Sequence, residues 1–444
     1  MKLQKFKVRN NKKFVFIFIS VIFLFLLGGI YLCKTYAVFS EEKHFNVING
    51  EVQDPGDVYF AYYVNDEITR EFPKQNTGYT LDTQKSNCTN GVKVNWDNKN
   101  WTALVNYQEY NATDYTRTRC NLYFKKTAVL NILNLAKNDT TNLALDDYGN
   151  TRYIGANPNN YVSIDGELWR IIGVMKDIDD GTGIKEDRIK LIRNESIGMY
   201  SWDSSDSSIN SGYGVNEWSQ AKLMKLLNPG YESESVGGSL YWNSKSGNCF
   251  TSLNFENSSC DFTDNGLSTK EKNLMDTVLW NIGALGSNDS DRITNASYMQ
   301  ERGTNPGNIC TTGEYCNDTI KRTTTWKGFV GLMYPSDYGY ATSGGITISR
   351  IECLSKSLYL WNDSSFSDCK GNNWLFNQNH YWTMTPSANS LYAHGMIVIN
   401  GSDGSIVVYG TNGKSNIYPV VYLSSNVLFS SGNGSIDNPF IPSL

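Results

Sequence analysis

Twenty consecutive residues without a charge, Phe14–Cys33 (FVFIFISVIFLFLLGGIYLC), constrain this chain more than any other feature. At helical rise that length crosses the hydrocarbon core of a bilayer, whereas a helix packed on a soluble core would carry a polar stripe. Residues 1–13 carry six basic side chains and no acid, which places such a tail on the cytoplasmic side. We therefore expect a transmembrane helix at 14–33, a cytoplasmic tail at 1–13, and a single-pass protein of the cell membrane whose C-terminal bulk is extracellular.

The charge is unevenly distributed along the chain. The formal net charge is −5, and because residues 1–13 contribute +6, the remainder sums to −11. An acidic bulk of this kind argues against nucleic acid as a partner. The partners that we expect are the membrane, through residues 14–33, and an extracellular carbohydrate or protein ligand.

Eight cysteines follow the apolar run, an even number that favours four disulfides in an extracellular protein. Eight cysteines allow about 105 connectivities, so the pairing of nearest neighbours is our hypothesis. Structural zinc is the rival explanation, but the chain has no CxxC and only three histidines. The predicted pairs are Cys88 with Cys120, Cys249 with Cys260, Cys310 with Cys316, and Cys353 with Cys369.

The pattern of apolar residues divides the extracellular part into segments. After a connector at 34–50, residues 51–126 contain four short runs of β-branched and aromatic residues between turn residues, which predicts a small β-sandwich-like (Ig/fibronectin-like) stalk domain. Residues 127–149 are expected to form a connecting helix and a linker.

The large segment 150–444 is expected to be one domain. Apolar spacing predicts helices at 216–230 and 268–283, the second begun by a capping box of Ser268 and Glu271. Short strands precede and follow them, and 396–410 is expected to form a hairpin. This order predicts an α+β fold, with two helices on a loop-rich antiparallel sheet.

Three stretches resemble known proteins. TYAVFSEEKHFNVING (35–50) resembles the TYAYFTD junction of camelysin- and TasA-type secreted proteins of Gram-positive bacteria, with Val38 as a departure. That resemblance implies release by cleavage after Ala37, while the length of the apolar run favours retention in the membrane. The segment containing GYTLDTQKSNCTNG and TRTRCNLYF looks like a stalk domain of gut Firmicutes surface proteins.

The third resemblance covers most of 150–444. NNYVSIDGELWRIIGV, VNEWSQAKLMKLLN and YWTMTPS are similar to clostridial surface modules that are related to C-type-lectin-like and formylglycine-generating-enzyme folds. The resemblance implies a C-type-lectin-like module whose distal loops bind a ligand. Tyr418, in IYPVVYL, stands where the motif of that group has Arg.

Catalytic and metal-binding patterns are weak. The chain has no G-x-S-x-G elbow, so we predict no enzyme. The pair Asp165 and Glu167 is better explained as part of a turn than as a glycosidase dyad. No cofactor and no metal ligand is predicted, although the acidic loops 177–183 and 203–208 leave calcium open without assigned residues.

Recognition remains as the predicted activity. Between 377 and 418, more than half of the residues are Asn, Ser, Tyr, Gly, His or Asp, a composition typical of adaptable binding loops. The leading hypothesis is an adhesion or recognition protein of the bacterial cell surface; the alternatives are an extracellular glycan-active hydrolase and a structural subunit of a surface fibre formed after leader cleavage. The candidate ligand-binding residues are Tyr381, Tyr392, His394, His380 and Asp403.

Overall fold

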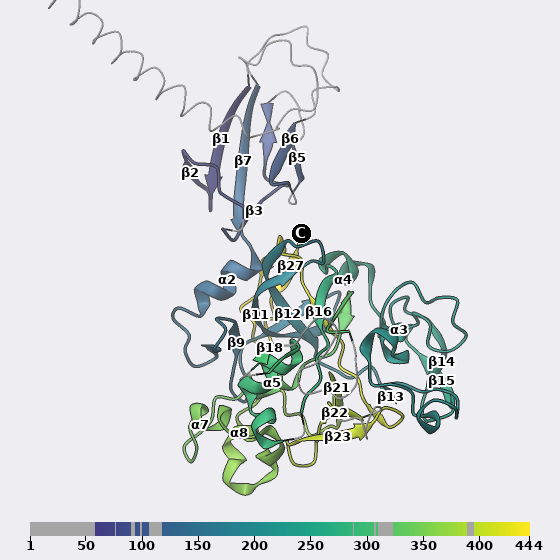
Figure 1. Ribbon diagram of the computed structural model, residues 1–444. Coiled ribbons are helices and arrows are strands. Elements are labelled where there is room, and N and C mark those ends of the chain that lie inside the picture. Colours follow the sequence, from purple (N-terminus) through teal and green to yellow (C-terminus); the bar gives the residue numbers. More distant parts are fainter. Residues whose placement is uncertain are drawn as a thin grey trace, which may run out of the picture. The chain divides into compact units, whose positions relative to one another are not determined.

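A computed structural model describes residues 58–75, 77–89, 94–97, 100–105, 118–286, 288–305, 308–309, 323–388 and 395–444. The chain divides into two compact units (Figure 1). The first contains the described residues up to 75 and within 80–125, and the second contains those of 76–79 and 126–444. The predicted tail, transmembrane helix and connector, residues 1–50, lie outside the described residues.

The first unit is a small β structure. Its main sheet has the order β2-β1-β7-β3, with β4 also paired to β7, and β1 and β7 run parallel. A disulfide joins Cys88 to Cys120 between β4 and β7. The strands are β1 (Val58–Val64), β2 (Glu67–Thr69), β3 (Tyr79–Leu81), β4 (Asn87–Cys88) and β7 (Thr118–Lys126), with a separate hairpin of β5 (Val94–Asp97) and β6 (Thr102–Val105).

The second unit is built on a seven-stranded antiparallel sheet of order β20-β25-β12-β11-β9-β8, with β10 paired to β11. Residues 169–175 of β11 are buried without interruption, so this strand lies in the core rather than with one face in water. The strands are β8 (Leu143–Leu145), β9 (Thr151–Tyr153), β10 (Tyr161–Ile164), β11 (Glu167–Asp179), β12 (Lys185–Arg193), β20 (Val330–Gly331) and β25 (Val420–Tyr422).

A second sheet of this unit has the order β13-β24-β21-β22-β23. Its β22–β23 hairpin turns through 400–405, as the Asn-Gly-Ser-Asp-Gly sequence predicts. Its strands are β13 (Met199–Ser201), β21 (Tyr381–Pro386), β22 (Gly395–Ile399), β23 (Ile406–Gly410) and β24 (Lys414–Asn416). Two-stranded pairs are formed by β14 (Ser246–Phe250) with β15 (Asn257–Asp261), β16 (Val278–Asn281) with β19 (Thr325–Gly328), β17 (Thr304–Asn305) with β18 (Asn308–Ile309), and β26 (Leu428–Ser431) with β27 (Ile441–Ser443).

The described helices are short. The capping box of Ser268 and Glu271 is present, but its helix ends after six residues because 278–281 pairs with β19 as a strand. The helix expected at 216–230 is reduced to a 3₁₀ turn at Trp218–Gln220 and the six residues of α3. The α-helices are α2 (Ala128–Leu135), α3 (Lys222–Leu227), α4 (Thr269–Leu274), α5 (Thr294–Glu301), α6 (Pro335–Tyr340), α7 (Arg350–Leu354) and α8 (Ser367–Gly371).

The predicted fold class is therefore wrong. The protein is mostly β, with 37% strand against 19% helix and several sheets, rather than α+β with two helices packed on one sheet. In the part of the chain that the structure describes, no helix is long and apolar enough to cross a bilayer, and the predicted transmembrane segment at 14–33 lies outside that part.

Two disulfides join cysteines in the described part of the second unit. Cys249 is bonded to Cys260 across the β14–β15 hairpin, and Cys353 of α7 is bonded to Cys369 of α8. Both bonds join neighbours in the sequence. Residues 310–316, where the remaining pair is expected, lie outside the described residues.

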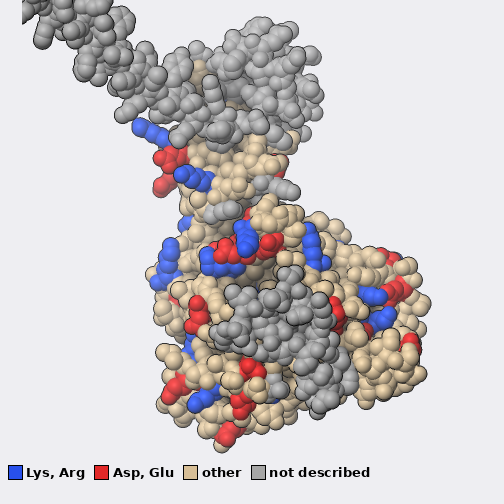
Figure 2. Space-filling model, viewed as in Figure 1, with Lys and Arg blue, Asp and Glu red and all other residues tan. Residues whose placement is uncertain are grey.

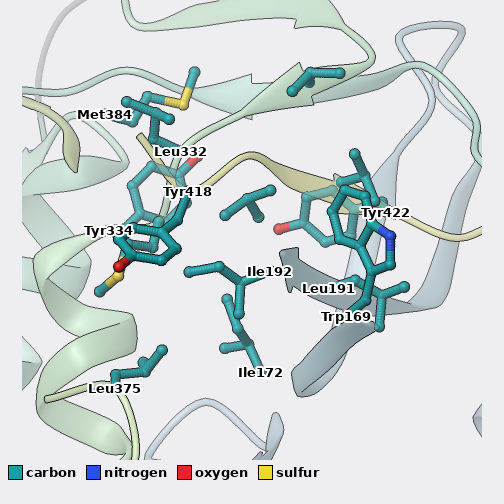
Figure 3. Packing of buried hydrophobic residues seen from close by; sticks show 14 of the residues in the cluster. Trp169, Ile172, Leu191, Ile192, Leu332, Tyr334, Leu375, Met384, Tyr418 and Tyr422 are labelled. Atoms are coloured by element: carbon teal, nitrogen blue, oxygen red, sulfur yellow. The ribbon is translucent and has the colours of Figure 1, made fainter. Parts of the chain in front are cut away.

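Charged side chains are sparse on the face seen in Figure 2, where Lys and Arg are interspersed with Asp and Glu between large uncharged areas. A large cluster of buried hydrophobic residues forms the core of the second unit. Figure 3 shows Trp169 of β11, Leu191 and Ile192 of β12 and Tyr422 of β25, which belong to one cluster of buried hydrophobic residues. Tyr418 and Leu375 belong to the same cluster, and both also line a cavity at its edge.

Candidate functional site: a cavity at a buried arginine

A cavity of about 70 Å³ opens at the edge of this core. Its wall is formed by the end of β12 with Asn194 after it, by the loop between α8 and β21, and by Tyr418, which lies just before β25. That volume is several times the 10–15 Å³ needed by one water molecule. It is lined by Arg170, Ile192, Arg193, Asn194, Trp374, Leu375, Asn377, Tyr381 and Tyr418.

Arg170 is positioned by the central sheet. On β11 it lies directly opposite Tyr161 of β10 and Ile192 of β12. Its guanidinium carbon is 4.4 Å from the ring centroid of Tyr161 and 4.4 Å from that of Trp374. Such cation–π contacts fix a guanidinium without using its in-plane N–H donors.

The charge of Arg170 has no counter-ion among the described residues. The residue is 9% exposed, and its Nε donates to Oδ1 of Asn160 at 2.9 Å. Its Nη2 is buried and has no hydrogen-bond acceptor. Burial lowers the pKa of Arg170 to about 10, so the group is still protonated at neutral pH. A buried charge that lacks a paired carboxylate is costly for a folded protein.

The second guanidinium of the cavity is already compensated. Arg193 binds Glu167 at 2.8 Å and donates to the backbone oxygen of Glu195 at 3.4 Å. The carboxylate of Glu195 accepts a hydrogen bond from Asn194. No carboxylate occurs among the described lining residues, so the cavity carries the one uncompensated positive charge of Arg170.

Two tyrosines form a further part of the lining. Tyr381 is 1% exposed and donates its hydroxyl to the backbone oxygen of Leu375. Tyr418 packs edge-on against Tyr381, with ring centroids 5.3 Å apart, and its hydroxyl accepts from Nδ2 of Asn379 at 3.1 Å. Burial raises the pKa of both phenols, so both remain neutral hydrogen-bonding groups.

Of the five candidate residues from the sequence, Tyr381 lines this cavity. His380 precedes it, is exposed, and uses its backbone oxygen to accept from Asn416. Asp403 organises the β22–β23 turn instead, where its carboxylate accepts from Ser405 and Asn400. Tyr392 and His394 lie outside the described residues.

Sequence reasoning missed Arg170 and Trp374, which come from strands and loops far apart in the chain. One signal was present: Arg170 interrupts the apolar run LWRIIGVM, and arginine is seldom buried without a role.

The carboxylates of the acidic segments accept hydrogen bonds from backbone amides. Asp179 accepts from the amides of Gly181 and Gly183, and Asp180 accepts from that of Thr182. Asp203 is buried and accepts from the amides of Val215 and Lys222. Within the described ranges, no group of three or more His, Cys, Asp or Glu residues is placed to hold a metal ion.

Asp165 and Glu167 belong to a turn between two strands. Asp165 has a φ of 51° and Gly166 a φ of 88° in the tight β10–β11 connection. Lys270 lies 3.7 Å from the exposed Asp165, while Glu167 binds Arg193.

A second cluster of charges is buried in the core and is fully paired. Asp337 of α6 binds Arg152 of β9 at 2.6 Å and Lys190 of β12 at 2.5 Å, and Arg152 also binds Asp146 at 2.8 Å. Burial lowers the pKa of Lys190 to about 8. Burial works to raise the pKa of Asp337, but Lys190 and Arg152 hold it at about 2.

Glu301 of α5 gives this region a pH dependence. Burial raises the pKa of Glu301 from 4.5 to about 7, and its carboxylate accepts from the amide of Ser336 at 2.9 Å. Between these two pH values the folded state keeps a proton that the unfolded chain has released, so the free energy of unfolding falls as the pH rises and levels off above about 7. We expect Glu301→Gln to remove this fall, as measured by urea unfolding at pH 4 to 8. Parallel profiles for the two proteins would contradict the assignment.

Comparison with known proteins found no matching family model, no similar curated protein and no similar solved structure.

Proposed function

We propose that the second unit is an extracellular recognition module that binds a carbohydrate or protein ligand in the Arg170 cavity, without chemical turnover. The observation that carries the proposal is a buried, charged guanidinium with an unused donor at a cavity wall. Groups of this kind are costly to leave unpaired, and a bound ligand supplies the missing acceptor.

Two further features support the proposal. The Cys249–Cys260 and Cys353–Cys369 disulfides suit an oxidising, extracellular environment. The described lining offers two amides and two phenols beside the guanidinium, but no carboxylate to serve as a general acid or nucleophile. Binding is therefore favoured over glycan hydrolysis.

The test compares the full chain with two matched variants on an array of glycans and extracellular proteins. Asn377→Trp places a large side chain at an exposed residue of the cavity, and Asn362→Trp places the same side chain at an exposed residue outside it. We expect the wild type and Asn362→Trp to share ligands that Asn377→Trp fails to bind. Ligands retained by all three proteins, or an array without ligands, would refute the proposal.

A further inference from the structure

We propose that the ligand is recognised through a carboxylate group, that of an acidic sugar, bound by the guanidinium of Arg170. This inference rests on the proposed function and adds the chemical class of the ligand. It follows from the charge, the remaining hydrogen-bond donors and the size of the cavity.

The charge selects a monoanion. Arg170 lacks a counter-ion among the described residues, whereas Arg193 is bound to Glu167. One negative charge on the ligand therefore neutralises the cavity, and a dianion would leave a buried negative charge in excess. A mixed surface without a large basic field, as Figure 2 shows for one face, agrees with recognition by one buried group rather than by general electrostatic attraction.

The donors select a planar acceptor. The rings of Tyr161 and Trp374 contact the guanidinium, and Nε is already used by Asn160. The donors of the two Nη groups have no acceptor among the described residues, and Nη2 itself is buried. Arginine binds carboxylates through its planar edge, often with two parallel hydrogen bonds.

The size and the remaining lining favour an acidic sugar. A volume of about 70 Å³ accepts a carboxylate and the atoms next to it rather than a whole oligosaccharide. The amides of Asn194 and Asn377 and the hydroxyl of Tyr418 border the same space and can pair with sugar hydroxyls. Only Ile192 and Leu375 are aliphatic among the described lining residues, which gives little room for the apolar side chain of a peptide terminus.

The experiment titrates the full chain with glucuronate and with glucuronamide, which has the same shape but no charge. A hydrogen bond to a charged group predicts that glucuronate binds about tenfold to a hundredfold more tightly. Arg170→Met should abolish this preference, while Arg119→Met, at an exposed residue of the first unit, should retain it. Because Arg170→Met alters a buried residue, Asn377→Asp provides an independent variant.

Asn377→Asp adds a carboxylate to the cavity lining and should weaken glucuronate binding, whereas Asn362→Asp should not. Equal binding of glucuronate and glucuronamide, tighter binding of glucose 6-sulfate, or binding of N-acetylalanine alone would each overturn the acidic-sugar assignment. Neutral sugars that bind the wild type but not Asn377→Trp would overturn it and leave the proposed function intact. No binding of any of these compounds in the cavity would overturn the assignment, and the array separately decides the proposed function.

Discussion

Asp337→Asn is expected to lower the free energy of unfolding of the second unit by about 3–5 kcal/mol, the range measured when one partner of a buried ion pair is removed. Asp337 is 2% exposed and is bound by both Arg152 and Lys190. The asparagine keeps the shape of the side chain but leaves Lys190 without a carboxylate and Arg152 with Asp146 alone. Denaturant unfolding followed by tryptophan fluorescence measures the change.

Asp165→Asn is the matched control for Asp337→Asn. It removes the same charge from a pair in which both side chains are 46% exposed, and such pairs contribute about 1 kcal/mol or less. Asparagine also tolerates the positive φ of this turn position. Adding Lys190→Met to Asp337→Asn should recover part of the lost stability, since it removes one uncompensated charge. Equal losses for Asp337→Asn and Asp165→Asn would show that the buried cluster is not held together by charge.

Arg170→Met is expected to behave in the opposite way: binding is lost while the free energy of unfolding stays within about 1 kcal/mol of the wild type or rises. Replacement of buried charged groups by apolar ones is often neutral or stabilising. The contacts with Tyr161, Trp374 and Asn160 favour the arginine, but they are offset by the desolvation of a charge without a counter-ion. A residue retained at the expense of stability is typical of a functional site.

Arg152→Met is the matched control for Arg170→Met. Both arginines lie on strands of the central sheet and both are buried, but Arg152 binds two carboxylates. Its replacement should therefore cost about 3–5 kcal/mol. A comparable loss for Arg170→Met would assign Arg170 to the architecture of the sheet rather than to binding.

Features of the fold that depend on residues close together in the sequence could be predicted. The turn at 400–405 and the capping box of Ser268 and Glu271 depend on residues within a few positions of one another. The segment 278–281 could not be assigned in this way. Its apolar spacing suits a helix, but Trp280 pairs with Trp326 across β16 and β19 and packs on Tyr422, so tertiary contacts decide its conformation.

The candidate site was less predictable because its parts are far apart in the sequence. Tyr381 was identified from the composition of its loop, but that composition could not separate it from Asp403, which serves a turn. Arg170 contacts Trp374 because the loop before β21 packs on the central sheet. The pairing of Asp337 with Lys190 joins residues 147 positions apart, a separation at which residue patterns carry no signal.

The most direct test of the central claim is a crystal structure of the full chain with glucuronate. We expect the carboxylate in the cavity, with an oxygen about 2.7–2.9 Å from a guanidinium nitrogen of Arg170. A sugar bound elsewhere on the protein, or bound in the cavity with its carboxylate directed away from Arg170, would contradict the account.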